Sequence, residues 1–170
     1  MAKAKRKAAP GDVATNRQAS FRYHLLDRLE AGIVLRGTEV KSLRAGGVNF
    51  KDSYATIRSG EGWLLGCHIN PYSHGTDANH APERDRKLLL HRKELGRLTG
   101  KIAERGLTLI PLRMYFKRGR VKVELGLGRG KKLHDKRATI RERDTRREMD
   151  QAARTAMRSG GTRRRSRDDE

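Results

Sequence analysis

Apolar and polar residues alternate along several segments in the middle of the chain, with the period of two that strands show. From residue 23 to residue 33 most apolar residues share one parity, which predicts a long strand interrupted at Asp27. A helix is the competing prediction, because Phe21, Leu25 and Leu29 also recur at a spacing of four. We favour the strand.

The same alternation predicts two hairpins. One strand begins at Val48 and ends at a turn around Gly60, and the apolar positions from Trp63 to Ile69 form its partner. Further on, LTLIPLRMYF, the turn KRGR and VKVELGLG predict a second hairpin. Pro111 inside the first of these strands indicates an edge or a bulge, since proline donates no ladder hydrogen bond.

A helix start is indicated by the sequence GTE, with Thr38 as the N-cap and Glu39 in the first turn, where the helix dipole favours a carboxylate. Val40 and Leu43 are expected to face inward, and Gly46 to end this helix. A second helix is predicted from about 92 to 105, after a long polar loop over 71–86. Its apolar stripe and its stop are expected to be formed by Leu95, Leu98, Ile102 and Gly106.

These elements predict a mainly β fold, a small OB-like antiparallel Greek-key barrel of about six strands with two or three short helices. Three zones are expected: a disordered basic arm over 1–15, the barrel over 16–128, and a basic tail over 129–170. A fold of this kind is a frequent nucleic-acid platform, but a fold alone does not establish a function.

The charge of the chain narrows the choice of partner. Lys and Arg number 40 against 20 Asp and Glu, which gives a formal net charge of +20 and a pI of about 11.0. Such a charge is best explained by a polyanion, with nucleic acid ahead of an anionic membrane surface, because the basic ends lack an apolar helix face. No apolar run approaches the roughly 18 residues of a membrane span, and no apolar segment follows MAKAKRK. We therefore expect a soluble, intracellular protein.

Histidines near the only cysteine raise the question of a metal site. His68, His74, His80 and His91 follow Cys67, but their spacings match no standard ligand pattern. A single cysteine also excludes an internal disulfide. We expect no metal and no cofactor, and we expect His80 to order the long loop.

Cations surround the three consecutive leucines of the segment RDRKLLLHRK. One interpretation is the approach to a helix with ordinary surface charges. The other is a basic rim around an exposed leucine that packs against RNA bases or riboses. The residues alone leave both open.

The run GRGKKLHDKR closes the apolar part of the chain. Its cations, Lys131, Lys132, Lys136 and Arg137, are candidates for phosphate contacts, and His134 is free to stack on a base. A solvated linker is the plain alternative. A catalytic pair of His134 and Asp135 is disfavoured, because adjacent residues rarely face each other and no second acid lies nearby.

The tail beyond this run is rich in helix formers. Its spacing pairs Glu142 with Arg146 and Asp150 with Arg154, but its apolar stripe is thin. We predict that 138–158 is disordered in the free protein and helical in a negatively charged groove, since an isolated helix of this length is marginal in water.

Several long stretches, taken in order, resemble one family. They are EAGIVLRGTEVKSLRAGGVNFKDSYA, HINPY, RDRKLLLHRKEL, GLTLIPLRMYF and GKKLHDKR. Between about Asn16 and Arg147 the sequence is similar to the SmpB family of bacterial SsrA-binding proteins. The terminal SGGTRRRSRDDE lies past the matching part and receives no role.

The resemblance implies a cytoplasmic RNA-binding protein without enzymatic activity. Such a protein binds the tRNA-like domain of transfer-messenger RNA (tmRNA) and delivers it to stalled ribosomes for trans-translation. Its tail would probe the empty mRNA channel and become helical over 138–158 on the ribosome. Elongation factor Tu and alanyl-tRNA synthetase would meet it through the shared RNA.

The resemblance also implies the site residues. Asn16, Glu30 and Leu89 match family residues implicated in RNA binding, where Glu30 would accept hydrogen bonds or orient a neighbouring cation. The cations expected to join them on the barrel are Lys41, Arg44, Arg86 and Lys87. The segment matching the ribosomal decoding-centre contact comprises Gly130, Lys131, Lys132, His134, Asp135, Lys136 and Arg137.

Overall fold

The chain divides into two units, Met1–Gly130 and Lys131–Glu170. The computed structural model describes residues 11–75 and 79–132, together with 135, 140, 141, 144, 145, 148–153, 155 and 156. His134, Lys136 and Arg137 lie outside the described residues.

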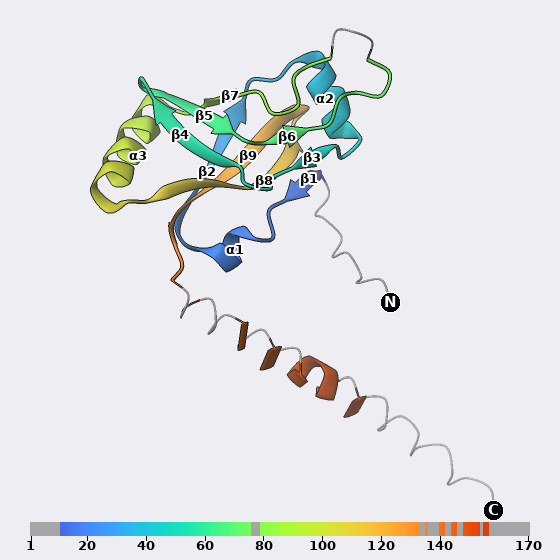
Figure 1. Cartoon of the computed structure of the whole chain (residues 1–170), viewed down its shortest axis with the longest axis vertical. Helices are drawn as coiled ribbons and strands as arrows, with labels where there is room; N and C mark the ends of the chain where they lie inside the picture. Colours follow the sequence, from blue (N-terminus) through green and yellow to red (C-terminus); the bar gives the residue numbers. More distant parts are fainter. Residues whose placement is uncertain are drawn as a thin grey trace, which may run out of the picture. The chain divides into compact units, whose positions relative to one another are not determined.

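The first unit is mainly β (Figure 1). Its helices are α1 (Ala19–Arg22), α2 (Gly37–Arg44) and α3 (Arg92–Arg105). Its strands are β1 (Asp12–Thr15), β2 (Tyr23–Ile33), β3 (Val48–Asn49), β4 (Tyr54–Arg58), β5 (Glu61–Leu65), β6 (His68–Ile69), β7 (Arg86–Leu89), β8 (Thr108–Lys117) and β9 (Arg120–Gly130).

Seven of the strands in the described part form one antiparallel sheet in the order β1-β8-β4-β5-β7-β2-β9. Because β8 also pairs with β9, the strands from β8 round to β9 close into a barrel, and β1 lies against β8 outside this ring. Strands β3 and β6 form a separate two-stranded sheet. The expected OB-like barrel is confirmed, and α2 and α3 lie at opposite ends of it in Figure 1.

Strand β2 confirms the strand prediction over the helix. Its register with β9 shifts between Leu25 and Asp27, which is a bulge, and Leu26 at the bulge is exposed. The bulge explains the interruption in the alternating pattern. Beyond it, Leu29 and Ala31 point into the barrel and are buried.

The barrel interior is filled by the apolar positions of the long strands and one residue from each larger helix. Strand β9 contributes Val123, Leu125 and Leu127, which are all nearly inaccessible to solvent. Leu43 of α2 and Leu98 of α3 join the same core cluster. These two helices therefore cover the ends of the barrel, whereas Ala19 of α1 packs against Ile110 and Leu112 of β8 in a second, smaller cluster.

Both predicted hairpins form, with tight turns whose central residues have positive φ. These are Ser59 and Gly60 (51° and 74°) between β4 and β5, and Arg118 and Gly119 (50° and 74°) between β8 and β9. The expected irregularity at Pro111 is also confirmed, because the β8–β9 register shifts between Pro111 and Arg113.

Several boundaries differ from the sequence-based expectation. The strand expected from Val48 is divided into β3 and β4, and its partner into β5 and β6. The expected disordered arm is too long at its end, since Asp12–Thr15 pairs with β8. The segment before α3, for which a loop leading into the helix was one interpretation, contains β7. The charged residues inside β7 obscure the alternation of apolar and polar residues that would have predicted a strand.

Helix α3 has the predicted bounds, and Gly106 ends it in the left-handed conformation with φ of 56°. The N-cap of α2 is Arg36 instead of Thr38, because the Glu39 carboxylate accepts the Arg36 backbone N–H at 2.6 Å. The Glu39 side chain turns inward and is fully buried.

In the second unit every described residue from 135 onward is helical. Thr145 and Thr155 donate hydrogen bonds of 3.0 Å to the carbonyl oxygens of Arg141 and Gln151. The expected ion pairs of the tail involve positions 142, 146 and 154, which lie outside the described residues. Disorder of this segment in the free protein stays a prediction.

Candidate nucleic-acid interface

The candidate site is a pair of cross-strand rows on the outer face of the barrel. In the first row, Leu89 of β7 lies opposite Gly32 of β2, which lies opposite Lys122 of β9, which in turn lies opposite Tyr115 of β8. In the neighbouring row, Glu30, Glu124 and Arg113 are aligned in the same way. We call these residues, together with Lys117 of β8, the sheet site.

Glu30 holds the polar part of the sheet site together. The Tyr115 hydroxyl donates to Glu30 Oε2 at 2.5 Å, and the Lys117 ammonium donates to the same oxygen at 2.8 Å. Lys122 Nζ lies 3.6 Å from Oε1. Hydrogen bonds from Lys117 and Tyr115 lower the pKa of Glu30 to about 2, so the group is a carboxylate at neutral pH. Burial and Glu30 raise the pKa of Tyr115 to about 12.

The other carboxylate of the site is also matched by cations. Glu124 accepts a hydrogen bond from Arg113 Nε and lies 3.6 Å from an Arg28 guanidinium nitrogen. Arg113 lies over the Tyr115 ring, with its Cζ 4.7 Å from the ring centroid. Each carboxylate thus fixes cations in place, and the surface keeps donors that can meet phosphate.

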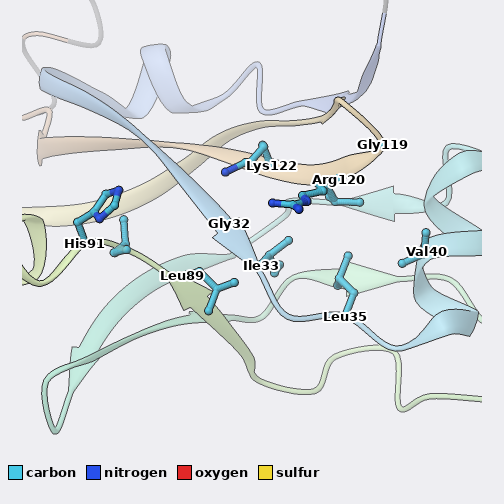
Figure 2. Close-up of a pocket in the computed structure, with 11 residues that line it drawn as sticks. Gly32, Ile33, Leu35, Val40, Leu89, His91, Gly119, Arg120 and Lys122 are labelled. Atoms are coloured by element: carbon cyan, nitrogen blue, oxygen red, sulfur yellow. The ribbon is translucent and has the colours of Figure 1, made fainter.

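Leu89 gives the site an apolar edge, and 55% of its surface is exposed. A Cβ added at Gly32 would lie 3.1 Å from the Leu89 Cβ, so the missing side chain at Gly32 makes room for Leu89. A groove of about 500 Å³ runs beside it (Figure 2). Figure 2 shows the groove bordered by Leu89 on one side and by Arg120 and Lys122 of β9 on the other.

The other expected barrel cations lie apart from these rows. Lys87 is half-buried and forms an ion pair with Glu61. Lys41 and Arg44 lie on the exposed face of α2, and Lys41 Nζ is 5.4 Å from the centroid of the Tyr72 ring. Lys41 and Arg44 therefore belong to a separate surface of the barrel.

The expectation that Arg86 contacts RNA is wrong. Its side chain is fully buried, with Nε 2.8 Å from Glu39 Oε1. The remaining donors reach the carbonyl oxygens of Cys67, Arg84 and Pro82. All three guanidinium nitrogens are thus used inside the protein, which leaves none for a ligand.

Asn16 supports the backbone near one end of the barrel. Its Nδ2 donates to the Pro111 carbonyl at 3.0 Å, and its Oδ1 accepts the backbone N–H groups of Gln18 and Ala19 at 3.2 Å. It is half-buried and lines a second groove, of about 400 Å³, between α1 and the β3–β4 connection. Its amide thus joins the bulge of β8 to the start of α1.

The basic segment after the barrel is described only in part. Gly130 is the last residue of β9 and pairs with Tyr23. Lys132 is exposed, and its backbone N–H donates to Asp135 Oδ2 at 3.2 Å. The expected contacts of His134, Lys136 and Arg137 fall outside the described residues.

The described histidines occupy unrelated positions. His80 is buried and its ring lies 3.1 Å from both Thr38 Oγ1 and the Ile69 carbonyl, which fits its expected role in ordering the loop. His68 lies 3.4 Å from Glu83. Burial raises the pKa of the Cys67 thiol to about 12. In the described part of the chain, no three His, Cys, Asp or Glu residues are grouped as metal ligands would be.

Sequence reasoning missed the most organised part of the site, namely Tyr115, Lys117, Arg120 and Lys122. A signal was present, because Tyr115 and Lys122 have the parity opposite to the buried Met114 and Val123. Period two therefore places them outside the barrel. Their proximity to Glu30 depends on the strand pairing.

None of the helices formed by the described residues is long and apolar enough to cross a membrane.

The chain is similar to known proteins over most of its length. It is 56% identical over 141 residues to the SsrA-binding protein of Trichodesmium erythraeum, covering 82% of this chain and 90% of that protein. It is 58% identical over 138 residues to the SsrA-binding protein of Syntrophobacter fumaroxidans, covering 81% and 86%.

A solved structure described as "tmRNA-SmpB: a journey to the center of the bacterial ribosome" has the same fold, with a TM-score of 0.61 and 54% identity. The match covers 74% of this chain and 87% of that chain. The family model for the SmpB protein matches residues 13–155. This chain belongs to the SmpB family.

Proposed function

We propose that this protein binds the tRNA-like domain of tmRNA and delivers it to stalled ribosomes for trans-translation. Membership of the SmpB family and relatives named SsrA-binding proteins support the RNA partner. The similar solved structure, which its description places with tmRNA in the bacterial ribosome, supports the ribosomal destination. The net charge of +20 suits both partners.

The sheet site carries the RNA contact of the barrel. The observation behind this assignment is that one carboxylate, Glu30, fixes Tyr115, Lys117 and Lys122 beside the exposed Leu89. The lysines meet phosphates, while Leu89 packs against a ribose or base. Glu30 acts mainly as the orienting acceptor, which is one of the two roles expected from the sequence.

Supporting contacts come from the rest of the barrel. Asn16 positions the backbone beside the second groove. Lys87, two residues before Leu89 on β7, adds positive charge outside the rows of the sheet site, and Lys41 and Arg44 add it on α2.

The segment after the barrel serves the ribosome. Gly130, Lys131, Lys132, Asp135, Lys136 and Arg137 lead to the decoding centre, where His134 stacks on a ribosomal base. The tail over 138–158 becomes helical in the empty mRNA channel and thereby reports that no message is present. Ordering a basic segment costs conformational entropy, which an anionic channel offsets.

The protein works in the cytoplasm as a carrier and not as an enzyme. Elongation factor Tu and alanyl-tRNA synthetase meet it through the shared RNA. An RNA-cleaving role for His134 and Asp135 is tested by incubating the protein with labelled tRNA-like RNA, with and without Mg²⁺. Intact RNA is expected, and cleavage would overturn the carrier role.

Recognition of a folded RNA is tested against general single-strand binding. The affinity for the tRNA-like domain is compared with that for an unstructured RNA of equal length over a salt series. We expect the tRNA-like RNA to bind more tightly at every salt concentration. Equal affinities with equal salt slopes would favour a general single-strand binder.

A further inference from the structure

The connection between β6 and β7, residues 70–85, forms no helix or strand in its described part, yet side chains fix its shape. Asn79 accepts the Tyr72 backbone N–H at 3.1 Å and donates to the carbonyl oxygens of Tyr72 and Gly75 at 3.2 and 3.1 Å. A Cβ added at Gly75 would lie only 2.7 Å from Asn79 Oδ1. The turn over 72–75 is therefore built around the Asn79 amide.

Buried polar groups join this loop to α2. The His80 ring contacts Thr38 of α2 and the Ile69 carbonyl. The Glu39 carboxylate of α2 accepts hydrogen bonds from Arg84 Nε at 2.9 Å and from Arg86 Nε of β7 at 2.8 Å. The loop is thus anchored to the helix at two points.

This buried network is an inefficient way to stabilise the folded protein. Glu39 and Arg86 are both fully buried, and taking both charges out of water costs free energy that their attraction only partly returns. A long irregular loop is also unusual unless it has a function. The network is better explained by a need to hold the turn over 72–75 in a fixed position against α2.

The turn over 72–75 presents aromatic rings beside cations of α2. The Tyr72 and His74 rings lie 5.4 Å apart between centroids, inclined at 45°. Lys41 Nζ lies 5.4 Å from the Tyr72 ring centroid, and Arg44 is exposed on the same helix. His74 is exposed and Tyr72 is half-buried.

We propose that Tyr72, His74, Lys41 and Arg44 form a second RNA contact, separate from the sheet site, that stacks an unpaired nucleobase and holds its phosphate. We call it the loop platform. It rests on the proposed function, because the RNA in question is the tRNA-like domain. Its rings offer π-faces that accept any base, and its cations offer phosphate contacts.

RNA is the occupant that this chemistry favours. Proteins that bind single-stranded nucleic acid combine Arg and Lys with aromatic rings on which bases stack, and the whole chain carries a charge of +20. A fixed loop also loses little freedom on binding, which favours affinity. A protein partner would be the alternative occupant, and the test below separates the two.

The test measures affinity for the tRNA-like domain with full-length variants at fixed salt. Tyr72→Leu removes the Tyr72 ring, Tyr72→Phe keeps it, His74→Ala removes the second ring, and Leu89→Ala reports on the sheet site. Tyr72→Leu is expected to weaken binding by about 5- to 150-fold, the range for loss of one stacked base. Tyr72→Phe is expected to bind as the parent does. Photo-crosslinking of the parent complex should attach RNA to the peptide containing Tyr72 and His74.

The outcomes distinguish the inference from the proposed function. If the parent fails to bind the tRNA-like RNA, both are overturned. If the parent binds and Leu89→Ala weakens it while Tyr72→Leu and His74→Ala do not, the loop platform alone is wrong and the surface is left to a protein partner. Equal losses for Tyr72→Leu and Tyr72→Phe would also overturn stacking. Unfolding curves of each variant, with unchanged midpoints expected, exclude a loss caused by misfolding.

Discussion

Leu89 lies directly opposite Gly32 in the antiparallel pair of β7 and β2, and its side chain occupies the space that a side chain at Gly32 would fill. The neighbouring Leu88 points the other way, into the core, and only 3% of it is exposed. Adjacent leucines of one strand therefore have separate tasks, and the sequence RKLLL gives no indication of which is which.

Leu89→Ala should weaken RNA binding without destabilising the fold. An exposed leucine that becomes covered on binding contributes about 1–2 kcal/mol to affinity. Leu88→Ala is the matched control, since it opens a cavity and should cost about 2–5 kcal/mol of unfolding free energy. Urea unfolding and RNA titration of both variants check this. Equal destabilisation by the two substitutions would contradict the opposite orientation of the leucines.

Glu30→Ala should also weaken binding of the tRNA-like RNA, by about 1–3 kcal/mol, because it releases Tyr115, Lys117 and Lys122. The direction of the change in affinity distinguishes this role from simple charge attraction. Removing a negative charge raises the attraction for any polyanion, so an RNA bound by charge alone would bind more tightly to the variant.

The control for Glu30→Ala is Glu83→Ala, which changes the charge equally at an exposed residue paired with His68. Glu83→Ala should leave affinity unchanged or slightly raised. If both variants bind the RNA more tightly than the parent, Glu30 has no organising role.

The carboxyl of Glu30 should titrate far below its usual value. The Lys117 and Tyr115 hydrogen bonds lower its pKa from 4.5 to about 2. A lowered pKa means that the stabilising contribution is present above pH 4.5 and disappears as the pH falls toward 2. Side-chain carboxyl NMR across this range measures it. In Tyr115→Phe the midpoint should move upward, and an unchanged midpoint near 4.5 in the parent would contradict the contacts.

Glu39→Gln should destabilise the protein by about 3–5 kcal/mol, because it leaves the buried Arg86 without its counter-charge. Burial raises the pKa of Glu39, but hydrogen bonds from Arg84, the Arg36 backbone and Arg86 outweigh it, so the pKa is lowered overall. Glu61→Gln breaks the surface pair with Lys87 and should cost less than about 1 kcal/mol. Chemical denaturation of both variants compares them, and similar losses would mean that the buried network is unimportant.

The sequence pattern predicted the parts of the fold in which local and tertiary preferences agree. In β2 and β9 the buried hydrophobic residues share one parity because one face of each strand packs on the core. In α3 the predicted stripe and Gly106 define the helix. Segment β7 was missed because it has consecutive leucines and a buried arginine, so no alternation of apolar and polar residues is visible.

The site could be predicted only as single residues. The resemblance drew attention to Glu30 and Leu89, but the partner of Glu30 is Tyr115, 85 residues further along the chain. Arg86 was assigned to the surface because of its charge, whereas its counter-charge Glu39 lies 47 residues away and draws it inside. The pairing of residues across strands and between elements determines both positions, and this pairing cannot be derived from the pattern of one sequence.

The central claim is a division of labour, in which the barrel binds the tRNA-like RNA and the tail acts on the ribosome. Its most direct measurement compares full-length protein with protein ending at Arg137, both for affinity toward the tRNA-like RNA and for tagging of peptides on stalled ribosomes. The account predicts nearly unchanged affinity and no tagging by the shortened protein. Normal tagging by the shortened protein, or a large loss of its RNA affinity, would contradict it.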